Sequence, residues 1–560
     1  MRAARGIWIV VAALTLGGLA LAPSARADGA TLLLDTSGAT DPHAAVRDLV
    51  AVDGSVFFFE LADGGPPTFW RSEGTAHATT PVVALPEGAK VSHVLPAAHT
   101  VFFMAGAGLW RSDGTAEGTQ RIGDWYDPAL QNWAGSNFDG SDGALYEATT
   151  IGDALFVAVF PDYPASVEWP SCILNGMLMR YDGSPGGRTM VASLRFVFAA
   201  LSTPHNSVCD IYLSSRIFPT ALRDRLAFFS APGTLFGTDA AGNAPEQLAQ
   251  FDGMPRRAVV VDDRVLVFAG FGESFWRTDG TDAGTFTLGG DSSYVWRMFA
   301  AGPRAFALEL GGVLSVMEVA GGEPPRNLGV FSYGAITSGA DVGGVLYFAV
   351  TAIPTYDGTI LPDDELGLWR SDGTTPGTTK IVSLNVGSWI VDVGGRAVFA
   401  APDPADARRQ VVWQSDGTAA GTLVAADVTP VGDTRPTVVG RTLFFVGTRD
   451  GSVGLWALTL PCAPTLDAAG RATCEVAGID QALRCSGDGA LPTWAGRKLD
   501  KLRSLLAKVP SHRAAVRRTR ALLRVLLRRG VRSARRHKAG PECIANIRAT
   551  LTETRALTGD

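Results

Sequence analysis

Four aspartates recur in nearly the same short phrase, and carboxylates are side chains that can serve acid–base chemistry or bind calcium. Asp113, Asp279, Asp372 and Asp416 are each preceded by Ser or Thr and followed by Gly-Thr. Catalytic carboxylates work as one pair in one cleft, whereas these occur once per repeat, and Glu73 replaces the aspartate in another copy. We therefore interpret the phrase as structural and predict no catalytic residue.

The phrase has the composition of a hairpin turn. Asp-Gly favours such turns because glycine accepts the positive φ that they require. The tryptophan three residues before the aspartate ends a strand, where its ring is expected to fill the wedge between sheets. The predicted structural residues of the repeat are Trp70, Trp110, Asp113, Gly114, Trp276, Asp279, Gly280, Trp369, Asp372, Gly373, Trp413, Asp416 and Gly417.

Two acidic segments are the only metal candidates in the sequence. They contain Asp139 and Asp142, and Asp363 and Asp364. Oxygen ligands suit calcium, but neither segment has the spacing of an EF-hand or a nonapeptide repeat. A solvated acidic loop is the preferred interpretation, calcium is the alternative, and no other cofactor or metal is predicted.

Six cysteines occur, and none forms the close pairs of a zinc or redox site. Cys172 and Cys209 lie in two interruptions of the repeat, so we predict a disulfide that joins these insertions. The remaining four allow three connectivities, of which we favour Cys462 with Cys474 and Cys485 with Cys543.

The elements that position the turns follow from a repeat of about 40 residues. Each unit has a short apolar run upstream of the turn, such as SVFFFEL or VLYFAVT, which is typical of a strand buried on both faces. Further apolar segments before and after complete four strands per unit. The nine units align on Trp70, Trp110, Met179, Phe236, Trp276, Val316, Trp369, Trp413 and Trp456.

Such sheets bury both faces when they stack radially, which predicts an all-β fold, a β-propeller of eight to nine four-stranded blades. The last unit lacks a fourth strand, and residues 31–35 near the start resemble one. The N-terminal strand is therefore expected to complete the last blade and close the ring. An open solenoid is the alternative.

The repeated W-[RQ]-[ST]-D-G-T-x-x-G-T phrase resembles the ELWxSDGTxxGT repeat of exported bacterial proteins, over residues 28–460. The resemblance implies a β-propeller and an extracytoplasmic location, and it implies no defined activity.

Residues 1–27 fit a signal peptide, with Arg2 and Arg5 before an apolar stretch and Ala25-Arg26-Ala27 as the cleavage pattern. No later segment has the ~20 apolar residues of a membrane span. We predict an exported protein that is periplasmic, on the cell surface or secreted.

Charge divides the chain into two parts. Residues 461–560 hold 20 basic and 8 acidic residues, a net charge of +12, whereas residues 28–460 hold 26 and 47, a net charge of −21. From residue 494 the pattern becomes helical: three amphipathic helices are expected, separated at Pro510 and before Pro541, with Gly530 weakening or ending the second. Residues 461–560 are therefore predicted to form a disulfide-stapled basic α-helical domain.

The second of these helices is crowded with arginines. An anionic envelope surface, the acidic propeller itself, or solvent could each face this basic patch. Nucleic acid is disfavoured, because no aromatic stacking platform accompanies the cations. The patch consists of Arg517, Arg518, Arg520, Arg524, Arg528, Arg529, Arg532, Arg535 and Arg536.

We therefore predict a non-enzymatic, exported scaffold that binds an unknown protein or glycan ligand. A carbohydrate-active hydrolase or lyase, with its site in the central funnel, is the alternative. Sequence gives no motif that supports the alternative, since no nucleophile elbow, phosphate loop or metal-binding histidine pattern is present.

Overall fold

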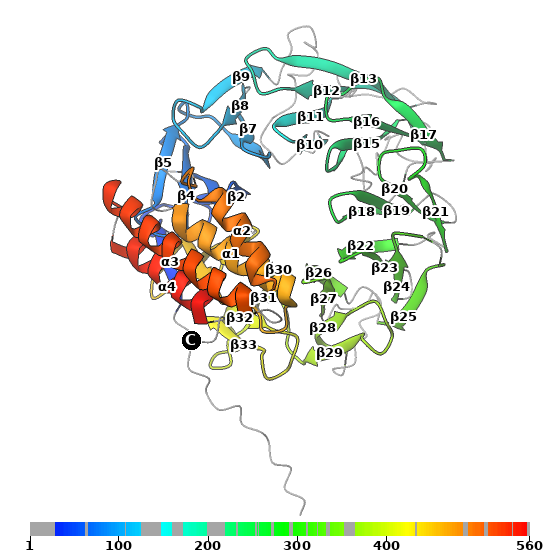
Figure 1. Cartoon of the computed structure of the whole chain (residues 1–560). Helices are drawn as coiled ribbons and strands as arrows, with labels where there is room; N and C mark the ends of the chain where they lie inside the picture. Colours follow the sequence, from blue (N-terminus) through cyan, green and yellow to red (C-terminus); the bar gives the residue numbers. More distant parts are fainter. Residues whose placement is uncertain are drawn as a thin grey trace, which may run out of the picture.

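The computed structural model contains a ring of four-stranded sheets and four helices (Figure 1). The structure describes residues 29–556 except 62–64, 107, 125–146, 160–171, 199–218, 231–232, 252–254, 256, 270–273, 291–294, 310–311, 322, 332–335, 352–364, 432–433, 485–490, 509–512 and 540. The predicted signal peptide therefore lies outside the described residues.

The described residues form nine blades: in blades 1 to 8 the four strands follow one another in the chain, and blade 9 also contains the N-terminal strand β1. Blades 1 to 3 are β2 (Val46–Val52), β3 (Ser55–Glu60), β4 (Thr68–Ser72), β5 (Thr79–Ala84); β6 (Val91–Pro96), β7 (Val101–Ala105), β8 (Gly108–Ser112), β9 (Gln120–Asp124); and β10 (Glu147–Ile151), β11 (Ala154–Val159), β12 (Cys172–Tyr181), β13 (Arg188–Phe198). Blades 4 to 6 are β14 (Thr220–Leu222), β15 (Arg225–Ser230), β16 (Thr234–Asp239), β17 (Glu246–Gln250); β18 (Arg257–Val261), β19 (Val265–Ala269), β20 (Phe275–Thr278), β21 (Phe286–Gly289); and β22 (Val295–Ala301), β23 (Arg304–Glu309), β24 (Val313–Glu318), β25 (Arg326–Val330). Blades 7 to 9 are β26 (Ile336–Val342), β27 (Val345–Val350), β28 (Gly367–Ser371), β29 (Thr379–Val382); β30 (Ile390–Val393), β31 (Arg396–Pro402), β32 (Gln410–Ser415), β33 (Leu423–Ala426); and β34 (Thr429–Pro430), β35 (Thr437–Val439), β36 (Thr442–Arg449), β37 (Ser452–Thr459) with β1 (Ala30–Asp35).

The N-terminal strand closes the ring. β1 pairs antiparallel with β37, which places Leu32 opposite Trp456, and β37 in turn pairs with β36. Contacts between neighbouring blades run all the way round, including β35 of blade 9 with β2 of blade 1. The predicted propeller and its predicted closure are confirmed, the blade number is nine, and the open solenoid is wrong.

The second strand of each blade supplies much of the core. β3 and β7 are buried along almost their whole length, as expected for strands enclosed on both faces. Nine apolar clusters lie along the described strands, and each combines side chains of two adjacent blades. A single blade therefore has no core of its own, and its stability depends on its neighbours.

The repeat tryptophans lie within these interfaces, as predicted. Trp369 stacks on Phe348 of its own blade, with ring centroids 6.2 Å apart, and meets Phe331 of the preceding blade edge-on at 5.1 Å. Trp276 meets Phe251 of the preceding blade in the same edge-on way. Edge-to-face contact is a favoured geometry for aromatic rings, so each tryptophan contributes to both blades.

Four helices follow the strands, rather than the three expected. They are α1 (Ala468–Arg484), α2 (Gly496–Leu506), α3 (Arg513–Arg536) and α4 (Pro541–Ala556). The sequence pattern missed α1, whose two glycines and several alanines weaken the amphipathic signal. Gly530 was expected to weaken or end its helix, and an end there is wrong, since α3 continues through it. Among the described residues, none of the four helices is both long enough and apolar enough to span a bilayer.

The helices pack as a bundle around one core that includes Ile479, Leu502, Leu526 and Ile547. Figure 1 shows this bundle on one sector of the ring, in front of the blades that contain β2 and β30–β33. It contacts the turns between first and second strands: Arg484 lies against Gly54 of blade 1, and Leu466 lies against Gly395 of blade 8. The bundle therefore covers part of the ring face that carries these turns.

Candidate functional site

The repeated turn is closed by its own hydrogen bonds. The hydroxyls of Ser371 and Thr378 are 2.8 Å apart, and the Asp372 carboxylate accepts from the backbone N–H of Thr374 at 2.9 Å and from its hydroxyl at 2.7 Å. Asp113, Asp279 and Asp416 make the same pair of contacts with the following threonine. One oxygen of each carboxylate is thus occupied in holding the turn.

The lowered pKa of Asp372 agrees with a structural role for the turn aspartate. The hydrogen bond from the Thr374 hydroxyl lowers the pKa of Asp372, with smaller contributions from the Thr374 backbone and from nearby arginines, while burial opposes the shift. A carboxylate with a lowered pKa stays ionised at neutral pH and is a poor general acid. This aspartate is therefore a fixed acceptor rather than a proton donor.

The glycine of the turn also contacts the adjacent blade. Gly373 has φ +83°, and a Cβ there would lie 2.6 Å from Cδ of Arg304 in blade 6. Gly280 is covered in the same way by Arg225 of blade 4, whose Nε donates to the Gly280 carbonyl at 2.8 Å. The phrase therefore forms a hairpin turn and also contacts the adjacent blade. Sequence alone did not reveal this contact.

The disulfide and calcium predictions have different outcomes. Cys462 and Cys474 form the expected bond, with Cα atoms 6.1 Å apart, and Cys543 is also disulfide-bonded. Cys209, Cys485 and the side chain of Cys172 lie outside the described residues, so the other two pairings stay predictions. The calcium candidates Asp139, Asp142, Asp363 and Asp364 also lie outside them. Within the described part of the chain, no three His, Cys, Asp or Glu side chains gather closely enough to hold a metal ion.

The strongest candidate site among the described residues is the outer face of α3, which we call the arginine face. Of the nine predicted patch residues, Arg520 is half-buried, and the other eight are exposed: Arg517, Arg518, Arg524, Arg528, Arg529, Arg532, Arg535 and Arg536. The helix contains no acidic residue. Leu523, Leu526 and Ala534 of the opposite face are buried in the bundle core, so packing fixes the direction in which the arginines project.

A buried group of charged side chains holds the bundle on the propeller. Arg441 of blade 9 is 3% exposed and pairs with Glu553 at 3.0 Å and with the equally buried Glu475 at 3.9 Å. Burial raises the pKa of Glu475, against the opposing effects of a hydrogen bond from Thr554 and the charge of Arg441. No sequence pattern pointed to this contact, because the three residues are isolated charges far apart in the chain.

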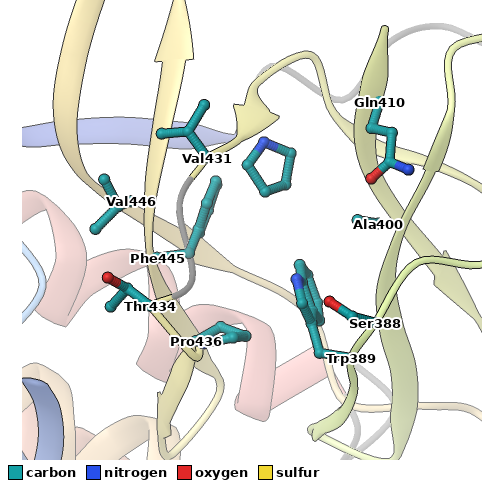
Figure 2. Close-up of a pocket in the computed structure, with 10 residues that line it drawn as sticks. Ser388, Trp389, Ala400, Gln410, Val431, Thr434, Pro436, Phe445 and Val446 are labelled. Atoms are coloured by element: carbon teal, nitrogen blue, oxygen red, sulfur yellow. The ribbon is translucent and has the colours of Figure 1, made fainter. Parts of the chain in front are cut away.

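One cavity of about 90 Å³ lies between blades 8 and 9 (Figure 2). The rings of Trp389 and Phe445 line it, together with the amide of Gln410 and the hydroxyls of Ser388 and Thr434. None of its lining residues is a carboxylate, a histidine or a cysteine. Drug-sized ligands occupy pockets of about 300–1,000 Å³, so this cavity admits at most a single small side chain or a comparable group.

These features define a nine-bladed β-propeller with a helical bundle whose outer helix is strongly cationic. No family model matches the chain, and no curated protein matches it. Similar solved structures include the computationally designed Ika8 protein, with 12% identity over 76% of this chain and 99% of that chain and a TM-score of 0.37. BamB from Moraxella catarrhalis is 13% identical over 67% and 95%, with a TM-score of 0.33, and dipeptidyl peptidase 4 from Porphyromonas gingivalis is 11% identical over 66% and 57%, with a TM-score of 0.39. These values are too low to support a statement about activity.

Proposed function

We propose that this protein is a non-enzymatic, exported scaffold that binds an anionic partner through the arginine face. Residues 28–460 form the supporting propeller domain and residues 461–560 the binding domain. We include in the proposal a relationship to the ELWxSDGTxxGT proteins, which the repeat phrase resembles. The observation that carries the proposal is the row of eight exposed arginines on one rigid helix, with no acidic residue on that helix.

Charge distribution supports this assignment. The propeller has a net charge of −21 and would repel polyanions, whereas residues 461–560 have a net charge of +12. A partner with negative charge is therefore steered to the bundle. The turn carboxylates are held in hydrogen bonds, and the cavity between blades 8 and 9 is small and lacks titratable groups, so these two features do not favour the hydrolase alternative.

The test compares two variants that change charge by the same amount. One replaces Arg524, Arg528, Arg532 and Arg535 by Glu, and the other replaces the exposed propeller cations Lys90, Arg264, Arg408 and Arg435 by Glu. We expect the whole chain to bind a heparin column and to elute earlier in the α3 variant only. An equally large loss of heparin retention in both variants would show that net charge, rather than the arginine face, controls retention. No retention of the unchanged chain at low salt would refute the proposal.

A further inference from the structure

The arginines of the arginine face lie in lines along the helix, and this arrangement restricts the class of partner that can bind. With 3.6 residues per turn, Arg517, Arg524, Arg528 and Arg535 fall on one line along α3, and Arg518, Arg529 and Arg536 fall on a second. Between the lines lie Ala514, Ala521, Val525 and Arg532. Ala514 and Ala521 make this strip shallow over the first half of the helix, and Arg532 adds a further cation to it nearer the C-terminal end.

From these rows, and resting on the proposed function, we infer that the partner is a linear anionic polysaccharide that lies lengthwise along α3. Arg517 and Arg535 are eighteen residues apart, which corresponds to about 27 Å at 1.5 Å per residue. A polymer with a negative group on each successive sugar can meet both arginine lines over this length. Arginine suits the task because its planar guanidinium pairs with carboxylate or sulfate through two parallel hydrogen bonds.

A lipid surface fits the arginine face less well. Helices that lie in a membrane interface insert bulky apolar side chains, and those of α3 are buried against the other three helices. Val525, which is 40% exposed, is the large apolar side chain that the described part of α3 presents to solvent. Adsorption to lipid would therefore depend on charge alone.

Nucleic acid also fits less well. Proteins that bind single strands combine cations with aromatic side chains on which bases stack, and α3 contains no aromatic residue. Trp494 lies beside α3, and its face is already covered by the Arg529 guanidinium, whose Cζ is 5.7 Å from the ring centroid. The arginine face thus recognises repeated negative charge without a platform for bases.

The experiment measures the binding of the whole chain to fluorescent polygalacturonate oligomers of increasing length. We expect affinity to rise steeply until an oligomer spans the arginine lines, about 27 Å, and to rise only slowly beyond that. Exchanging Arg517, Arg524, Arg528 and Arg535 for Gln should weaken binding of the long oligomer about 600-fold at low salt, since each of the four cations near an anionic surface contributes about a factor of five. Gln has nearly the helix propensity of Arg, so α3 is retained, and circular dichroism verifies this.

A control variant and two alternative ligands, lipid vesicles and DNA, distinguish the possible outcomes of this experiment. The Gln variant of Lys90, Arg264, Arg408 and Arg435 should bind the long oligomer within about threefold of the unchanged chain, because these side chains lie on the propeller. Affinity that does not depend on oligomer length would overturn the lengthwise arrangement. Tighter binding to phosphatidylglycerol vesicles, or to DNA of matched charge, would overturn the polysaccharide while keeping the proposed function. Failure to bind all three ligands would overturn both.

Discussion

The aspartate and the last glycine of the repeat phrase depend on each other. A Cβ at Gly377 would lie 2.0 Å from Oδ1 of Asp372, and a Cβ at Gly118 would lie 2.0 Å from Oδ1 of Asp113. The glycine is needed here because the carboxylate occupies the space of a side chain, and not because the backbone adopts a positive φ.

The substitution Gly377→Ala should therefore destabilise the propeller by about 1–3 kcal/mol, because the methyl group displaces a carboxylate that holds the turn. Gly123→Ala is the matched control: nothing lies within 4 Å of its Cβ position, and its effect should be small. Urea unfolding of both variants measures the difference. Equal midpoints for the two variants would contradict this explanation.

The same carboxylate predicts a pH dependence. The pKa of Asp372 is lowered in the folded protein, chiefly by the Thr374 hydroxyl, so its contribution to stability is present above the unfolded value of about 3.9. That contribution is lost as pH falls through the folded pKa. Asp182 and Asp239 shift in the same direction through hydrogen bonds from Ser184 and Asn243. Several turns should therefore weaken together in acid.

Asp372→Asn tests this dependence because the amide oxygen can still accept from Thr374 but does not titrate. We expect the free energy of unfolding to fall less steeply between pH 5 and pH 2 in the variant than in the unchanged chain. Urea midpoints measured at several pH values give the two slopes. Identical slopes would show that this turn does not contribute to acid sensitivity.

At the scale of elements, α3 needs a glycine at its crossing with two other helices. A Cβ at Gly530 would lie 2.6 Å from Cδ2 of Leu483 in α1 and 3.3 Å from Cγ2 of Ile547 in α4. The close approach of the three helices explains why a residue of poor helix propensity occupies the middle of a long helix. It also explains why the break predicted from sequence does not occur.

Gly530→Ala should thus destabilise the bundle by about 1–2 kcal/mol, although alanine is the better helix former. Gly496→Ala in the first turn of α2 meets nothing within 4 Å and should be neutral or stabilising. Thermal unfolding followed by circular dichroism compares the signs of the two effects. A stabilising effect at Gly530 would mean that the helices can move apart without cost.

At the scale of the whole molecule, the ring depends on a single edge pairing. β1 supplies the outermost strand of blade 9, and Ala30 and Leu33 are buried in the clusters that join blade 9 to blades 8 and 1. A chain that lacks β1 would expose the edge of β37, and exposed strand edges promote association between molecules.

Removing residues 1–36 should therefore cost at least about 3 kcal/mol of unfolding free energy and cause concentration-dependent aggregation. Removing residues 1–27 alone leaves β1 in place and should change neither property. Urea unfolding and light scattering at several protein concentrations compare the two truncations. Equal stability of both would show that blade 9 does not need its N-terminal strand.

The arginine face was only partly predictable. The sequence identified its nine arginines, but it left open whether they contact an outside partner, the propeller or only solvent. The structure shows eight of them exposed, and it shows a buried ion-pair contact with the propeller at Arg441, Glu475 and Glu553. Helical periodicity defines the face of an isolated helix, whereas the packing of four helices decides which face remains outside.

Sequence alone predicted the strands, the turns and the nine units, because each of these depends on apolar runs and Asp-Gly turns within about 40 residues. It predicted the closure of the ring because the last unit lacks a strand and residues 31–35 resemble one. Only the tertiary structure decided that Arg304 covers Gly373, that α1 forms, and that Gly530 lies within α3. Those features depend on residues of other blades and other helices, and local pattern does not contain the distances between them. Contacts between neighbouring blades and between neighbouring helices are therefore the features that the tertiary structure was needed to show.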